Sequence, residues 1–220
     1  VKNNVNGNIY GAKYFGVVAK ENNGKILNSY IDGTLKTPDA NNIAGIAQIN
    51  NGTIANIRSK LNMDLAEWSG YSSPDARAFS LGVSENRGKL YNVWTEGDIT
   101  KSTWTINSGS KFNGYICAYS YEGSSVENCY YKKSSAGDFL SNAVGQDYGS
   151  TENVSEVTGI DNAKYNKVSD ASDIEGVKNL SNTSAPKIIL FKSDDSTVEK
   201  TKITYGASVK LPYSVNDNYY

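Results

Sequence analysis

The sequence predicts an all-β fold, a parallel β-helix of about four to five coils, on the basis of its composition and of a repeated phrase. The 220 residues include 20 Gly and 16 Tyr but only 4 Pro. Glycine and the abundant asparagine favour turns, whereas tyrosine and the β-branched residues favour strands. The phrase NNGKILNS at 22–29 returns as NNGTIANI at 50–57 and as NRGKLYNV at 86–93, and YEGSSVENC at 121–129 is a looser copy.

Each copy of the phrase places the same kinds of residue around a glycine. The glycines, 28, 36 and 35 residues apart, are Gly24, Gly52, Gly88 and Gly123. Five residues before them stand Ala19, Ala47, Val83 and Ala118, and two or three residues after them stand Ile26, Ile54, Leu90 and Val126. Four or five residues after them stand Asn28, Asn56, Asn92 and Asn128. Apolar and polar residues tend to alternate around each glycine, which indicates a strand, a turn and a second strand.

Three short strands joined by turns are enough for one coil of a parallel β-helix, and stacked coils bury a continuous core. We expect the two apolar columns to face that core. We expect the repeated asparagines to stack at one corner, each amide donating to one neighbouring coil and accepting from the other. The repeated glycines would supply positive φ at a corner. A β-propeller is the alternative, although its blades have four strands and usually about 40 or more residues.

Breaks in the alternating pattern divide the chain. Residues 1–180 are predicted to form the β-helix, with loop insertions at 64–78 and 101–112 that carry turn-forming residues. From about 138 to 180 the apolar density falls, and we expect this part to form a C-terminal cap over the open end of the solenoid. Residues 181–186 read as a linker. Residues 187–220 are predicted to form a β-hairpin or a truncated small β module.

Two pieces of the chain, AGIAQINNGTIAN and SVENCYY, resemble the GLUG-type repeat of bacterial surface proteins, over about residues 4–131. The resemblance implies a right-handed parallel β-helix within a large secreted or cell-wall protein of a Gram-positive bacterium, such as an adhesin or a surface protease. Ser29, Ile57 and Val93 depart from the family pattern, which has cysteine there. The ending TYGASVKLP resembles the start of the Listeria–Bacteroides repeat of Gram-positive surface proteins.

Catalytic groups are scarce in this chain. It has no histidine, which excludes Ser-His and Cys-His nucleophile pairs and any His-containing zinc site. Two cysteines cannot form a four-cysteine zinc site, and no phosphate-binding or calcium-binding loop is present, so we expect no metal and no cofactor. Cys117 and Cys129 are expected to be small buried residues, with a disulfide as the alternative. Polysaccharide lyases that share the parallel β-helix resemble one another in using Arg or Lys as the catalytic base, with carboxylates nearby. In this chain the pair of residues closest to that arrangement is Arg58 with Asp64.

Aromatic side chains give the only indication of a ligand. Trp68 and Tyr71 lie in the first insertion, Trp104 lies in the second, and Trp94 follows a repeat corner. The fourth copy is crowded with Tyr119, Tyr121, Tyr130 and Tyr131. Aromatic rings on loops form flat platforms that suit a sugar or a protein partner. Packing of these rings against the flank of the coil is the alternative.

These features predict a non-catalytic extracellular module, at the cell surface or secreted, that acts as a spacer or adhesive stalk. A polysaccharide or a host surface protein is the candidate partner. The net charge of −1 gives no reason to expect nucleic acid, and no apolar run is long enough to insert in a membrane. Val1 is not an initiator residue, so we expect a larger parent chain. The alternatives are a polysaccharide-active β-helix enzyme, a lyase or hydrolase, and an accessory region of a larger surface protease or glycosidase.

Overall fold

The computed structural model describes residues 2–8, 14–36, 42–64, 78–100, 112–133, 140, 142–177, 187–191 and 198–202. The chain divides into two compact units, Val1–Val177 and Lys178–Tyr220. The first unit contains two sheets of parallel strands and one helix, so the prediction of a mostly β chain with parallel sheets is confirmed. Among the described residues no helix combines the length and the apolar character needed to cross a membrane.

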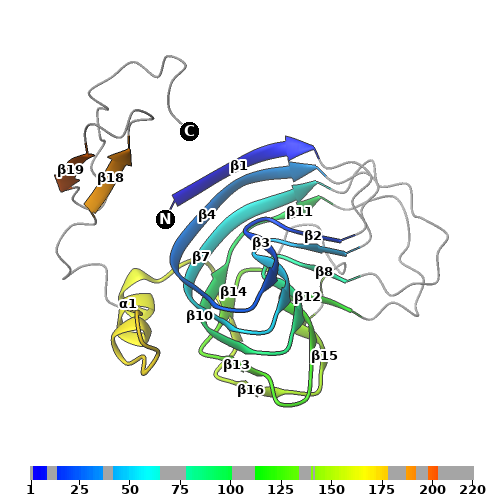
Figure 1. The fold of residues 1–220 in the computed structure, drawn as a ribbon. Helices are drawn as coiled ribbons and strands as arrows, with labels where there is room; N and C mark the ends of the chain where they lie inside the picture. Colours follow the sequence, from blue (N-terminus) through cyan, green and yellow to red (C-terminus); the bar gives the residue numbers. More distant parts are fainter. Residues whose placement is uncertain are drawn as a thin grey trace. The chain divides into compact units, whose positions relative to one another are not determined.

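The first sheet follows the sequence repeat, because its main strands pair in chain order (Figure 1). They are β1 (Lys2–Asn8), β4 (Lys25–Lys36), β7 (Thr53–Asp64), β10 (Lys89–Thr95), β13 (Ser125–Glu127) and β16 (Ser150–Glu152). Three shorter strands extend the sheet, namely β11 (Ile99–Thr100), β14 (Tyr130–Tyr131) and β17 (Ser155–Glu156). All these pairs are parallel, so the chain returns to the same direction in every repeat.

The second sheet holds the strands that come just before β4, β7, β10, β13 and β16 in the chain. One series is β2 (Tyr14–Gly16), β5 (Asn42–Ala44) and β8 (Phe79–Ser80), and the other is β3 (Ala19–Asn22), β6 (Ala47–Asn50) and β9 (Val83–Asn86). Both series meet the long strand β12 (Asn113–Ser120), which pairs with β15 (Asn142–Asp147). Five times, therefore, the chain passes from the second sheet through a short turn into the first.

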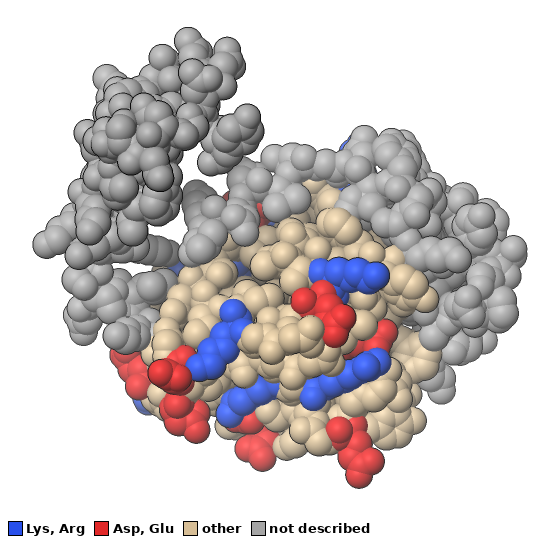
Figure 2. All heavy atoms as spheres, viewed as in Figure 1, with Lys and Arg blue, Asp and Glu red and all other residues tan. Residues whose placement is uncertain are grey.

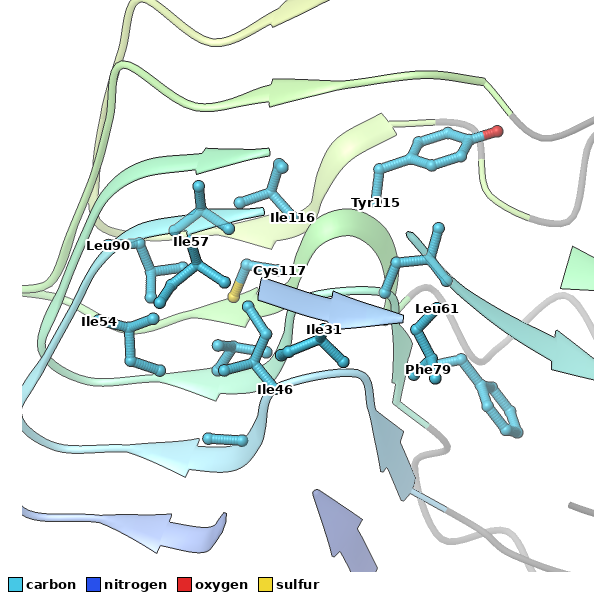
Figure 3. Packing of buried hydrophobic residues seen from close by; sticks show 14 of the residues in the cluster. Ile31, Ile46, Ile54, Ile57, Leu61, Phe79, Leu90, Tyr115, Ile116 and Cys117 are labelled. Atoms are coloured by element: carbon cyan, nitrogen blue, oxygen red, sulfur yellow. The ribbon is translucent and has the colours of Figure 1, made fainter. Parts of the chain in front are cut away.

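The apolar columns lie in register between the strands. Ile26 pairs with Ile54, Ile54 with Leu90 and Leu90 with Val126, as the repeat predicts. From Ile54 onward this column has no exposed surface, and it belongs to the single large cluster that fills the space between the sheets (Figure 3). Burying an aliphatic side chain of this size contributes about 1.5–3 kcal/mol, so the aligned column is a main source of stability.

The other column departs from prediction in the fourth repeat. Ala19 pairs with Ala47 and Ala47 with Val83, but the partner of Val83 in β12 is Cys117, not Ala118. Alignment on the fourth glycine fails because the turn between β12 and β13 is two residues longer than the turn between β9 and β10. Strands alternate between faces, so a shift of one residue exchanges the inward and outward side chains.

The predicted positive φ is found at only one of the four repeated glycines, and two others are explained by close backbone contact. Of Gly24, Gly52, Gly88 and Gly123, only Gly123 has a left-handed φ, of 81°. A Cβ on Gly52 would collide with the carbonyl oxygen of Gly24, and a Cβ on Gly88 would collide with the carbonyl oxygen of Gly52. Glycine is therefore required at these turns because successive backbones approach closely, and not because φ is positive.

Asparagine takes the left-handed conformation instead. φ is 51° at Asn28, 58° at Asn56, 51° at Asn92 and 52° at Asn128, and a fifth copy, Asn153, has 53°. Its short polar side chain lets asparagine visit this region more readily than other non-glycine residues. Nδ2 of Asn56 donates to Oδ1 of Asn28 at 2.6 Å, and Nδ2 of Asn92 donates to Oδ1 of Asn56 at 2.8 Å. These bonds form the first asparagine ladder, and they match the predicted stacking for Asn28, Asn56 and Asn92. The fourth predicted member, Asn128, is not joined to the ladder among the described hydrogen bonds, and the Oδ1 of Asn92 accepts from Trp94.

A second asparagine ladder lies at the preceding turn and was not predicted. Nδ2 of Asn22 donates to Oδ1 of Asn50, and Nδ2 of Asn50 donates to Oδ1 of Asn86, both at 2.8 Å. All three side chains are buried. The signal was present in the sequence, because each asparagine stands two residues before a repeated glycine. Buried amides that satisfy one another in this way fix the register of neighbouring repeats.

After β17 the chain forms the strap, which is our name for residues 160–177. It contains α1 (Asn162–Asp170). Oδ1 of Asp161 accepts hydrogen bonds from the backbone N–H groups of Ala163 and Lys164, which is the usual way an N-cap residue starts a helix. In Figure 1 the helix lies beside the parallel strands.

The strap contacts three successive repeats. Its bonds join the Ile160 N–H to Glu96 Oε2 (2.9 Å), the Tyr165 hydroxyl to the Asn56 carbonyl (2.9 Å) and Asn28 Nδ2 to the Gly176 carbonyl (2.8 Å). The strap thus runs back along the side of the sheets, from the third repeat to the first. This position differs from the cap predicted at 138–180, since β16 and β17 remain exposed among the described residues.

In the second unit the described residues form one antiparallel pair of strands. β18 (Lys187–Phe191) pairs with β19 (Val198–Lys202), which is the pairing that the predicted hairpin requires, and the residues that join the two strands lie outside the described ones. The rest of the segment predicted as a small β module lies outside the described residues.

Candidate functional site

Most of the predicted ligand-binding aromatic residues fall in segments that are not described. Trp68 and Tyr71 belong to 65–77 and Trp104 belongs to 101–111, and both ranges lie outside the described residues. Their role therefore stays a prediction.

Trp94 is described, and its position contradicts the predicted role. Its side chain is only 1% exposed. Nε1 donates to Oδ1 of Asn92 at 2.7 Å, and the ring lies 4.3 Å from that of Tyr130 and 6.2 Å from that of Tyr165 in the strap. A ring covered in this way has no face free for a ligand, so Trp94 is a packing residue between β10 and the strap.

Three other aromatic residues gather on the surface. Tyr119, Tyr121 and Tyr148, which we call the tyrosine cluster, line an open depression of about 430 Å³ together with Glu122. The ring centroid of Tyr119 is 4.4 Å from that of Tyr121 and 5.6 Å from that of Tyr148, and both pairs are tilted by more than 50°. Tyr148 is 59% exposed, which is high for an aromatic side chain. The rings therefore line an accessible trough that offers aromatic faces to a ligand.

The repeat itself brings these rings together. The N–H of Tyr121 donates to the carbonyl of Asn86, and the N–H of Tyr148 donates to the carbonyl of Ser120, so the two tyrosines occupy the same turn position in neighbouring repeats. Arg87 occupies that position one repeat earlier, since its N–H donates to the carbonyl of Asn50. An outward column of turn residues is thus a direct product of the parallel register.

A charged pair borders the tyrosine cluster. Nη2 of Arg87 lies 2.9 Å from Oε2 of Glu85, and the Tyr121 hydroxyl donates to the same oxygen at 3.2 Å. The Arg87 guanidinium carbon also lies 4.7 Å from the Tyr121 ring centroid, within the range of a cation–π contact. These contacts fix the orientation of Tyr121.

The hydroxyl group of Tyr119 is neutral at physiological pH. Desolvation, with smaller contributions from Tyr148, Tyr121 and Glu85, raises the pKa of Tyr119 above its ordinary value of 10.0. A neutral phenol both donates and accepts hydrogen bonds, as hydroxyl-rich ligands require.

The residues considered for catalysis are not brought together. Arg58 and Asp64 lie six residues apart in β7, which at about 3.3 Å per residue separates them by roughly 20 Å. Nη2 of Arg58 donates to Oδ1 of Asn162 at 2.6 Å, and its guanidinium carbon lies 5.0 Å from the Tyr165 ring centroid. The strap therefore engages Arg58, and it holds the guanidinium away from the carboxylate that the lyase comparison would pair with it.

The cysteines are free and buried, as expected, and they do not form a disulfide. Sγ of Cys117 donates to the carbonyl of Tyr119, and Sγ of Cys129 donates to the carbonyl of Glu127. Burial raises the pKa of Cys117 far above its ordinary value and raises that of Cys129 to about 12. Since the thiolate is the reactive form, neither side chain is poised as a nucleophile.

Charges of both signs are mixed on the face shown in Figure 2. Several form ion pairs across repeats or with the strap, such as Lys60 with Glu96 at 2.6 Å and Lys25 with Glu175 at 3.2 Å. In the part of the chain that the structure describes, no group of three or more His, Cys, Asp or Glu residues could hold a metal ion. The tyrosine cluster is therefore the described surface that best fits a ligand. Comparison of the chain with protein-family models, with curated proteins and with solved structures gives no match.

Proposed function

We propose that the first unit is a right-handed parallel β-helix of five coils, preceded by β1, in a non-catalytic module of an extracellular bacterial surface protein. The in-register pairing of five successive repeats and the two asparagine ladders support the helical part. The handedness, the cell-surface location and the Gram-positive source rest on the resemblance to the GLUG-type repeat. A stack of this kind makes a stiff spacer, because each coil is fixed to its neighbours by backbone hydrogen bonds.

We further propose that the module binds glycans at the tyrosine cluster. The observation that carries this proposal is the accessible trough of three tilted rings, Tyr119, Tyr121 and Tyr148. Tyrosine suits such a site because it combines a flat apolar face with a polar hydroxyl and loses little conformational entropy on binding. The apolar faces of a sugar ring would lie on the aromatic faces, and the sugar hydroxyls would meet the phenols and the charged rim.

A non-catalytic role fits the chemistry of the described residues better than the lyase or hydrolase alternative. Arg58 is held by the strap, and the thiols of Cys117 and Cys129 are buried and protonated. An accessory region of a larger surface protease or glycosidase would use the same binding face, and it differs only in what the rest of the parent chain does.

A polysaccharide and glycan-array screen of the purified chain tests this proposal. The double variant Tyr119→Ala, Tyr148→Ala should weaken binding by at least about fivefold to tenfold, the effect of losing about 1 kcal/mol or more at an interface aromatic residue. Tyr14→Ala is the matched control, because Tyr14 is 48% exposed in the first repeat and lies outside the cluster.

Two further arms make the result decisive. Trp68→Ala with Trp104→Ala tests the platform predicted for the two insertions, and each sample is assayed for new reducing ends or unsaturated sugars. Binding that survives the tyrosine substitutions but not the tryptophan substitutions would move the site to the insertions. Release of product would overturn the non-catalytic role, and absence of binding to any glycan would leave only the spacer role.

A further inference from the structure

We infer that the tyrosine cluster, if it binds a glycan as proposed above, prefers one that carries free ammonium groups, such as a glucosamine polymer. Neutral and acidic polysaccharides would be weaker ligands. This inference rests on the proposed glycan-binding function and adds the charge of the ligand to it.

One carboxylate in the depression, that of Glu122, is not engaged by any described residue. Glu122 lines the trough and is exposed, and it forms no hydrogen bond or ion pair with any other described residue. The two neighbouring carboxylates differ from it. Glu85 is paired with Arg87, and Asp147 accepts hydrogen bonds from the N–H of Gly149 at 3.0 Å and the hydroxyl of Thr151 at 2.7 Å. Glu122 is therefore the anionic group that a ligand can reach.

No basic side chain among the described residues forms an ion pair with Glu122. Arg87 is the nearest basic side chain in the column of turn residues, and it lies over Tyr121 with its charge offset by Glu85. An acidic sugar would meet Glu122 without a free basic partner, and like charges disfavour binding. An ammonium group would meet a carboxylate that no described residue engages.

The rings add a second reason for a cationic ligand. Aromatic faces attract cations, and the chain uses this contact internally, with Lys164 Nζ lying 3.9 Å from the Tyr130 ring centroid and Arg87 lying over Tyr121. Among the described residues no cation lies over Tyr119 or Tyr148. An amino sugar stacked on these two rings would place its ammonium group beside both a π face and Glu122.

The test compares two oligosaccharides of equal length and linkage, an oligomer of glucosamine and an oligomer of N-acetylglucosamine, by calorimetry at mildly acidic pH with the full chain. They differ only in the charge and acetylation of the amino group. We expect the glucosamine oligomer to bind at least about fivefold more tightly, which is the combined effect of one exposed ion pair and one exposed cation–π contact. Added salt should reduce this preference.

Glu122→Gln should remove most of the preference while leaving the affinity for the acetylated oligomer unchanged. Glu152→Gln is the control, because it makes the same charge change at an exposed strand residue outside the depression. Equal affinities for the two oligomers, or a preference that persists in Glu122→Gln, would overturn the inference and leave the glycan-binding function standing. Failure of both oligomers and of every glycan in the array would overturn the glycan-binding function as well.

Discussion

Replacing Asn56 by alanine should lower the free energy of unfolding by about 3 kcal/mol. Asn56 is fully buried, and its side chain bonds to Asn28 on one side and to Asn92 on the other. Loss of these two hydrogen bonds costs about 1 kcal/mol each. An alanine held at the φ of 58° adds about 1 kcal/mol, because its Cβ crowds the backbone and no polar side chain compensates.

Asn56→Gly separates the two contributions. Glycine loses the same hydrogen bonds but accepts a positive φ, so we expect a loss of about 2 kcal/mol. Urea unfolding followed by tryptophan fluorescence measures both variants, and an unchanged m-value shows that they share one unfolding transition. If alanine proves as stable as glycine, or if both lose less than about 1 kcal/mol, the ladder does not stabilise the protein through these hydrogen bonds and this backbone conformation.

Three further predictions concern close stacking, the strap and a buried thiol. Gly52→Ala should cost about 1–3 kcal/mol, because its Cβ would meet the Gly24 carbonyl, whereas Gly24→Ala has no atom within 4 Å of the new Cβ and should change stability by less than about 1 kcal/mol. Equal losses in urea unfolding would contradict the stacking explanation. Tyr165→Phe removes the bond to the Asn56 carbonyl and should cost about 1 kcal/mol, and an unchanged urea midpoint would show that this bond contributes nothing. Burial holds the pKa of Cys129 at about 12 against an ordinary 9.0, so the folded state keeps a proton that the unfolded state loses. The stability advantage of wild type over Cys129→Ala should therefore be largest below about pH 9 and decline up to about pH 12, and a difference that does not vary with pH would contradict this.

The repeated phrase was sufficient to predict the strands and one of the two inner columns. Ile26, Ile54, Leu90 and Val126 were found because glycine, an apolar residue and asparagine recur at nearly fixed spacing, and parallel pairing preserves that spacing. Ala118 was misplaced by one residue because counting from Gly123 assumes that every turn has the same length. Turn length depends on local backbone hydrogen bonds, such as that from the Ser124 N–H to the Tyr121 carbonyl, and composition does not determine it.

The candidate site was less accessible to prediction, and Trp94 shows why. The left-handed bend at Asn92 interrupts the alternation of faces, so the direction of a residue just beyond it cannot be counted from the strand before. The ring of Tyr165, which lies far away in the sequence, packs against Trp94 and helps to bury it. Tyr148 was missed because the fifth copy of the phrase, DYGSTENV at 147–154, was not recognised. It keeps Gly149 and Asn153 four residues apart but has Asp147 in place of the leading asparagine and Thr151 in place of the apolar residue. The backbone pairing confirms that Tyr148 is equivalent to Tyr121.

The return of the strap to the first repeat has a mechanical consequence. Val177 packs in one cluster with Leu27 and Ala55, so the chain leaves the unit beside β4 and β7 and not beside β17. Tension applied to the chain beyond Val177 would therefore reach the strap first and leave the exposed edge of the last repeat unloaded. Bonds spread along three repeats share such a load, whereas a chain leaving from β17 would peel its strands off one at a time. Such tension would therefore have to break the contacts of the strap with three repeats before it reached the strands of the last one.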